Sequence, residues 1–134
     1  MKSAAIDTSV IVRLLTNSPE DQARRALDEL TGKLASGASV FVSDLVVSET
    51  YFALQHHYQM PKEEALALLS EFLADSGVTP TGAAATVLTV PRLATTKPGF
   101  VDRLIHAEAI RFAEEFLTFE KAARRLKHAR VLRV

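Results

Sequence analysis

Short apolar runs alternate along the chain with longer segments whose apolar residues recur at helical spacing. The runs at residues 4–6, 39–42, 78–80, 116–118 and 129–134 predict strands. In the second run, Val40, Phe41 and Val42 follow one another directly, which is typical of a parallel strand buried on both faces.

The intervals between these runs predict helices at about residues 8–15, 19–36, 44–58, 61–76, 83–93 and 100–114. Ser18 and Ser43 are the expected N-caps of the second and third helices, and Gly37 and Gly77 the expected terminators of the second and fourth. Pro91 must kink or end the fifth. Strands that alternate with helices throughout indicate an α/β fold with a mainly parallel sheet.

Composition limits the class of protein. A chain of 134 residues with 48% apolar and 24% charged residues, and without repeats or linkers, predicts a single globular domain over residues 1–134. The absence of cysteine excludes disulfides and thiolate zinc sites. The first apolar run meets Asp7 before a signal-peptide core can form, and no stretch approaches a membrane span of about 20 apolar residues. We therefore expect a cytoplasmic protein with no membrane partner.

The charges are balanced overall but uneven along the chain. Sixteen basic and sixteen acidic residues cancel, so net charge does not indicate a nucleic-acid partner. Residues 121–134, however, contain no acid and six cations: Lys121, Arg124, Arg125, Lys127, Arg130 and Arg133. This segment is either a strip that faces phosphate groups or a solvated basic tail.

Four acidic residues occupy equivalent places in the predicted topology. Asp7 follows the first strand, Glu49 lies two turns into the helix after the second, Asp102 lies in the first turn of its helix, and Glu120 follows the fourth strand. In a parallel sheet these regions project toward the same carboxyl-end edge. The sequence therefore predicts that the four carboxylates share one crevice.

Each acid also has a structural alternative. Asp7 and Glu120 could cap helices, Asp102 could complement a helix dipole, and Glu49 could be a boundary residue that reaches water. Asp7 has the weakest structural explanation, because an acid at the end of a parallel strand has little structural work to do. Taken together, four acids in one crevice would repel one another unless a divalent cation compensated them. Without His or Cys ligands, such a cluster favours Mg²⁺-dependent phosphodiester hydrolysis over zinc proteolysis.

At these positions the chain resembles PIN domains, in particular the VapC-type toxin ribonucleases of type II toxin–antitoxin systems. Residues 5–15 are similar to the family's opening strand and its Asp-Thr-Asn/Ser signature. Residues 42–49, 100–105 and 117–121 are similar to the segments that carry the family's three further acids.

The resemblance implies a three-layer α/β/α fold with a mainly parallel sheet of about five strands. It also implies that Asp7, Glu49, Asp102 and Glu120 are catalytic residues that ligate Mg²⁺ or Mn²⁺. Thr8, Ser9 or Thr118 would support them by hydrogen bonding. The implied substrate is RNA, and the implied partners are a second copy of the chain in a homodimer and a VapB-like antitoxin.

Two positions depart from the family pattern. The fourth motif ends in Glu120 where Asp is usual, and Gly99 stands where many relatives carry an acid. These departures favour an alternative function, a non-catalytic or weakly active PIN-fold binding or scaffold module. A DNA nuclease or flap-type enzyme shares the site chemistry, but the small chain leaves little room for a threading arch.

Several other polar residues could belong to a site. The adjacent His56 and His57 point about 100° apart on a helix and cannot chelate one ion together. His106, one turn after Asp102, is better explained by packing or surface exposure. Arg13 and Lys121 are either phosphate contacts or ordinary surface cations.

Overall fold

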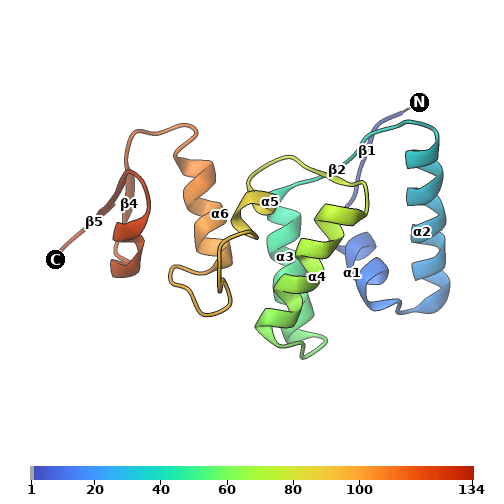
Figure 1. The fold of residues 1–134 in the computed structure, drawn as a ribbon, viewed down its shortest axis with the longest axis horizontal. Coiled ribbons are helices and arrows are strands. Elements are labelled where there is room, and N and C mark those ends of the chain that lie inside the picture. The colour runs from blue at the N-terminus through green and yellow to red at the C-terminus, as the bar shows by residue number, and fades with distance from the viewer. Residues whose placement is uncertain (1) are drawn as a thin grey trace.

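The computed structural model describes residues 2–134, whose strands form two separate parallel sheets (Figure 1). The first sheet has the order β1 (Ala4–Ala5), β2 (Val40–Val42) and β3 (Thr79–Pro80), with Ala4 opposite Val40 and Val42 opposite Pro80. The second contains β4 (Phe116–Thr118) and β5 (Ala129–Val131). All five predicted strands are present, but they are divided between two sheets.

Helices lie on both sides of the first sheet, so the predicted α/β fold is confirmed. The helices of the described chain are α1 (Thr8–Thr16), α2 (Glu20–Ala35), α3 (Asp44–His56), α4 (Lys62–Asp75), α5 (Ala84–Val87), α6 (Phe100–Ala109) and the 3₁₀-helix η1 (Lys121–Arg125). Two predicted helices are shorter than expected. α5 gives way to turns ahead of Pro91, which cannot continue a helix, and α6 ends in tight i→i+3 turns after Ala109.

The predicted helix ends agree with the structure at three of four positions. The Ser43 hydroxyl accepts from the Val46 N–H at 3.2 Å and caps α3. Gly37 and Gly77 have φ values of 85° and 86° where α2 and α4 terminate. The Ser18 cap is wrong, because Pro19 occupies the N-cap position of α2 and no side chain caps that end.

The hydrophobic core surrounds the first sheet. Ile11 and Leu54 are fully buried and Leu69 is 1% exposed, within one cluster that α1, α3 and α4 share with the strands. No residue of the described chain beyond Leu104 belongs to this cluster. None of the helices in residues 2–134 combines the length and apolar character needed to cross a bilayer.

Residues 116–134, which we call the C-terminal unit, form one end of the elongated molecule, far from α2 (Figure 1). His106 on α6 joins this unit to the body. Its Nε2 lies 2.7 Å from the Lys127 carbonyl oxygen, and its ring meets Phe116 edge-to-face at 5.4 Å. His106 is 7% exposed, so of the two explanations that the sequence left open, packing and surface exposure, the structure supports packing.

Candidate functional site

Asp7 leaves β1 and caps α1. Its carboxylate accepts a hydrogen bond from the Ser9 hydroxyl at 2.6 Å and one from the Val10 N–H at 3.3 Å. The hydrogen bond from Ser9 is the main reason that the pKa of Asp7 lies below its ordinary value. The Val10 N–H and the nearby Arg13 guanidinium lower this pKa further. Asp7 is thus an exposed, ionised and oriented carboxylate. The prediction that it has little structural work was wrong, because it is the N-cap of a helix.

Glu49 on α3 is linked to the segment of Asp7 through Thr8. The Thr8 hydroxyl donates to Oε1 of Glu49, so the residue that follows Asp7 fixes the second carboxylate. We call Asp7 and Glu49 the first acid pair. Glu49 is exposed and borders a mostly apolar groove of about 380 Å³ between α3 and α6. Glu49 is therefore a boundary residue whose side chain reaches solvent, as its structural alternative predicted.

Asp102 and Glu120, the second acid pair, line another pocket of about 250 Å³. Asp102 lies in the first turn of α6, and Glu120 caps η1 by accepting from the Ala122 N–H at 3.3 Å. The Thr118 hydroxyl accepts from the Glu120 N–H at 3.0 Å, so Thr118 supports the acid through its backbone.

Two cations that the sequence analysis did not single out, Lys62 and Lys97, line the pocket of the second acid pair. Lys62 begins α4, and Lys97 lies in the loop before α6. Lys62 is remote in sequence from both acids, whereas Lys97 stands in the loop that leads to Asp102, and no local pattern marks either lysine as part of a site. The pocket therefore combines two carboxylates with two ammonium groups, a mixed lining that suits a phosphate bridged to cations.

The two acid pairs do not join within one chain. Among residues 2–134, no three His, Asp or Glu side chains form a group that could hold a metal ion. The sequence predicted that all four carboxylates share one edge of one sheet. The structure departs from this because, in the described part of the chain, β4 pairs with β5 alone and leaves Glu120 outside the first sheet. Carboxylate oxygens are suitable Mg²⁺ donors, but their arrangement in a single chain does not fit the ion.

Asp44 is a further important acid, and its role here is structural. Its carboxylate accepts from the Ala83 and Ala84 N–H groups at 2.9 and 3.0 Å. A Cβ on Gly82 would lie 2.3 Å from an Asp44 oxygen, so only glycine leaves room for this contact. The contact ties the start of α3, one turn before Glu49, to the connection between β3 and α5. A single acid behind a serine N-cap gave no sequence signal for it.

The remaining candidates divide into surface and packing groups. His56 and His57 are exposed at the end of α3. Arg13 donates to the Ser9 carbonyl oxygen at 2.9 Å and to the side-chain oxygen of Gln22. Both hydrogen bonds engage its guanidinium in contacts within the chain.

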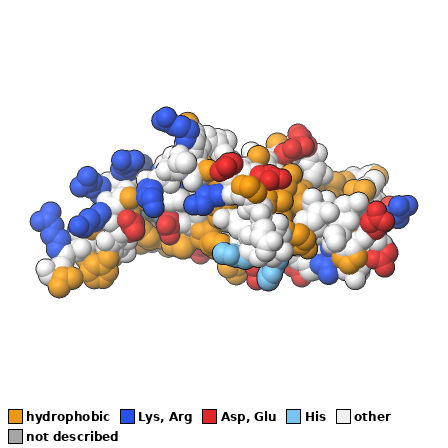
Figure 2. Space-filling view, turned by 90° about the horizontal axis from the view of Figure 1, so that it is seen from below, with side chains coloured by type: hydrophobic (Ala, Val, Ile, Leu, Met, Phe, Trp, Pro, Cys, Tyr) orange, Lys and Arg blue, Asp and Glu red, His pale blue; other side chains and the backbone are white. Residues whose placement is uncertain are grey.

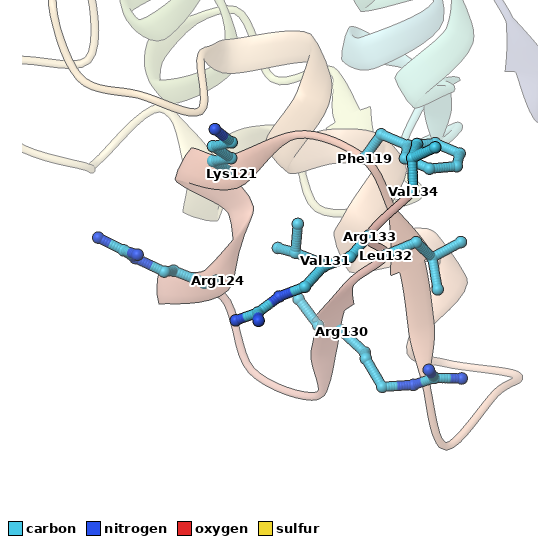
Figure 3. A pocket seen from close by; sticks show the side chains of 9 residues that line it. Phe119, Lys121, Arg124, Arg130, Val131, Leu132, Arg133 and Val134 are labelled. Carbon is cyan, nitrogen blue, oxygen red and sulfur yellow. The ribbon is translucent and has the colours of Figure 1, made fainter.

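The C-terminal unit carries the densest positive charge. All six cations of residues 121–133 are exposed, and Figure 2 shows Lys and Arg gathered at this end of the molecule. A cavity of about 840 Å³ lies on the same unit. Figure 3 shows apolar side chains, among them Phe119 and Leu132, together with Arg124, Arg130 and Arg133 around it.

Comparison with known families matches residues 4–129 to a family described as "PIN domain". The matched range contains both acid pairs. No curated protein matches the chain.

Proposed function

The chain belongs to the PIN domain family, generally a nuclease fold, and on this basis we propose that it is a metal-dependent endoribonuclease. We further propose that it is the toxin of a VapBC-type toxin–antitoxin pair. The observation that carries the nuclease proposal is the state of Asp7. Its carboxylate is ionised, exposed and oriented by Ser9 and Val10, and the neighbouring Thr8 holds Glu49 by a hydrogen bond.

The proposed ligands are the carboxylates of Asp7, Glu49, Asp102 and Glu120, which offer only hard oxygen donors, as Mg²⁺ and Mn²⁺ prefer. Held by these carboxylates, a divalent ion would supply charge stabilisation at a phosphodiester. The protein's own contribution is orientation. Thr8 and Ser9 fix the first acid pair before any ligand arrives, and preorganised groups lose little freedom when they bind.

The cations of the C-terminal unit support RNA as the substrate. Exposed Lys and Arg side chains bind nucleic acid through its phosphates, independently of sequence. Phe119, 66% exposed among these cations, offers a face on which an unpaired base can stack. This combination of charge and aromatic surface suits single-stranded RNA.

Exposed apolar side chains support a protein partner on another face. Leu45 is 80% exposed, Ile105 54% and Phe52 46%, around the groove between α3 and α6. Surface patches of this kind typically mark protein contacts. We propose that the antitoxin binds over this helical surface, where it would also cover Glu49.

Cleavage of RNA by the purified protein tests the nuclease proposal. We expect cleavage with Mn²⁺ or Mg²⁺, none with EDTA, and a loss of at least about 100-fold in Asp7→Asn, because an amide removes an anionic ligand. Asp28→Asn is the matched control, since it makes the same change at an exposed position in α2. Equal cleavage by Asp7→Asn and Asp28→Asn would refute the proposal and indicate a contaminating nuclease.

A non-catalytic binding module is the second candidate function, and the separation of the two acid pairs within one chain favours it. Such a module would bind RNA with the same salt dependence but would not cleave it. In that case Mn²⁺ would neither raise the melting temperature nor support cleavage, whereas RNA binding would persist in Asp7→Asn.

A further inference from the structure

β1 has a free edge. Ala4 donates to the Ser39 carbonyl oxygen at 2.9 Å and Ile6 to that of Phe41 at 3.0 Å, so both residues face β2. Because parallel strands alternate the direction of their backbone groups, the N–H and C=O of Ala5 point to the opposite edge. No other described strand pairs there, and Ala5 is exposed.

β4 has a free edge of the same kind. Phe116 donates to the His128 carbonyl oxygen at 2.9 Å, and the Thr118 carbonyl oxygen accepts from Leu132 at 2.7 Å. The backbone groups of Leu117, between them, therefore point away from β5. Within residues 2–134 nothing pairs with this edge either.

The C-terminal unit is too small to bury its own apolar side chains. Leu117 is 52% and Phe119 66% exposed, and Ala123 is the one buried hydrophobic residue of this unit in the described chain. A two-stranded sheet is marginal in isolation, and an exposed strand edge is a template for pairing with another strand. The unit therefore requires a further strand, and β1 offers the matching edge.

The contacts of α6 indicate whether β4 pairs with β1 of its own chain or with β1 of a second copy. His106 fastens the C-terminal unit to α6, while Phe100 and Leu104, each 2% exposed, fasten α6 to the core. To reach its own β1, the unit would have to break one of these attachments. Pairing with a second copy breaks neither.

We infer that two copies of the chain exchange strands, β4 of each pairing in parallel with β1 of the other. The exchange extends each first sheet to five strands in the order β3-β2-β1-β4-β5, the last two from the second copy. It is reciprocal, so it closes as a two-fold dimer with no edge left at β1 or β4.

The same pairing joins the two acid pairs. Asp7 stands just beyond β1 of one copy and Glu120 just beyond β4 of the other, at the carboxyl ends of neighbouring parallel strands. Asp102 comes to the same place together with Glu120, because both residues line one pocket. Each completed site thus takes one acid pair from each chain. That this composite site is catalytic rests on the proposed function, whereas the strand exchange does not.

Crosslinking tests the exchange without reference to activity. The chain has no cysteine, so Ala5→Cys and Leu117→Cys can be made singly, co-expressed and treated with a short bis-maleimide. We expect a covalent dimer containing one chain of each kind. Leu117→Cys co-expressed with Ala67→Cys, an exposed position on α4, is the matched control and should give none. Equal yields in both mixtures would overturn the inference, as would a solution mass of one 14.7 kDa chain for the unaltered protein.

Leu117→Pro provides a second, independent variant. Proline removes the N–H that points to the free edge but none of the bonds to β5, and edge strands tolerate it for that reason. We expect the solution mass to fall to one chain, whereas Leu117→Ala should stay dimeric. A Leu117→Pro protein that remains dimeric contradicts the exchange, and if this variant does not fold, the mass and crosslinking of the other proteins decide.

Complementation separates the exchange from the proposed function. Asp7→Asn and Glu120→Gln should each be inactive alone. Co-expressed, they form mixed dimers in which one site carries both substitutions and the other carries none, so about a quarter of wild-type cleavage should return. No recovery, with an active wild type, overturns the composite site. If crosslinking succeeds while the wild type cleaves nothing, the exchange stands and the nuclease proposal fails.

Discussion

Substituting Gly82 by alanine tests whether Asp44 fixes the start of α3. A Cβ at position 82 would lie 2.3, 2.5 and 2.7 Å from the three carboxyl atoms of Asp44, far inside van der Waals contact. The carboxylate cannot simply rotate away, because the N–H groups of Ala83 and Ala84 hold both of its oxygens. Gly82→Ala must therefore break the contact between Asp44 and the β3–α5 connection.

The size of the effect follows from those two bonds. Each charge-assisted bond contributes about 1.5–3 kcal/mol when buried, and half-burial with access to water reduces the pair to about 2–3 kcal/mol. Alanine also lowers the entropy of the unfolded chain, which returns about 0.4–1 kcal/mol. Gly82→Ala should thus destabilise the protein by about 1–2 kcal/mol, or about 4–8 °C in melting temperature.

Urea unfolding of four proteins, the wild type, Gly82→Ala, Asp44→Ala and the double variant, measures the coupling. With Asp44 already removed, Gly82→Ala should cost nothing or stabilise by about 0.4–1 kcal/mol, because nothing is left to displace. The two sites should therefore couple by about 2–3 kcal/mol. If Gly82→Ala costs the same in both backgrounds, its effect is local to the loop and Asp44 does not hold α3.

Three further predictions concern the first acid pair and the C-terminal unit. Thr8→Val, which removes the donor to Glu49, should lower kcat about fivefold, and Thr8→Ser should restore it; an unchanged kcat would show that Thr8 does not orient the acid. Because the folded-state pKa of Asp7 is lowered, its contribution to stability is complete above the ordinary value of about 3.9 and disappears as the pH falls through the folded value. Asp7→Asn should therefore unfold less steeply in acid than the wild type, and parallel curves would contradict this. His106→Phe keeps an aromatic ring but loses the bond to the Lys127 carbonyl oxygen, so trypsin should cut within η1 several times faster while the melting temperature of the core stays the same; equal cleavage rates would show that His106 does not anchor the unit.

The elements of the fold could be predicted because their signals are local. The apolar triplet of β2, the serine that caps α3 and the glycines that end α2 and α4 each act within a few residues. The places of the four acids relative to their elements could be predicted for the same reason, Asp7, Asp102 and Glu120 at element ends and Glu49 inside a helix. Their order along the chain is enough to identify the motifs.

The pairing of strands could not be predicted, because it depends on contacts between residues far apart in sequence. The residues near Phe116 and Thr118 carry no signal that would show whether β4 pairs with β1 or forms a separate sheet with β5. His106 decides this by binding Lys127, a contact across 21 residues between a helix and a loop. Asp44 is a similar case, since its partners lie 39 and 40 residues away. The capping role of Asp7 is the opposite case, because an Asp directly before a helix is a local signal for an N-cap.

The order of the strands along the chain has a consequence for biosynthesis. β1, β2 and β3 are complete by Pro80, so on the ribosome the first sheet and its core helices can form while the segment that contains β4 is still unmade. The sheet thus waits with β1 open throughout the later part of translation. A finished chain nearby, for instance one released from the same messenger RNA, reaches that edge before the nascent chain has a β4 of its own.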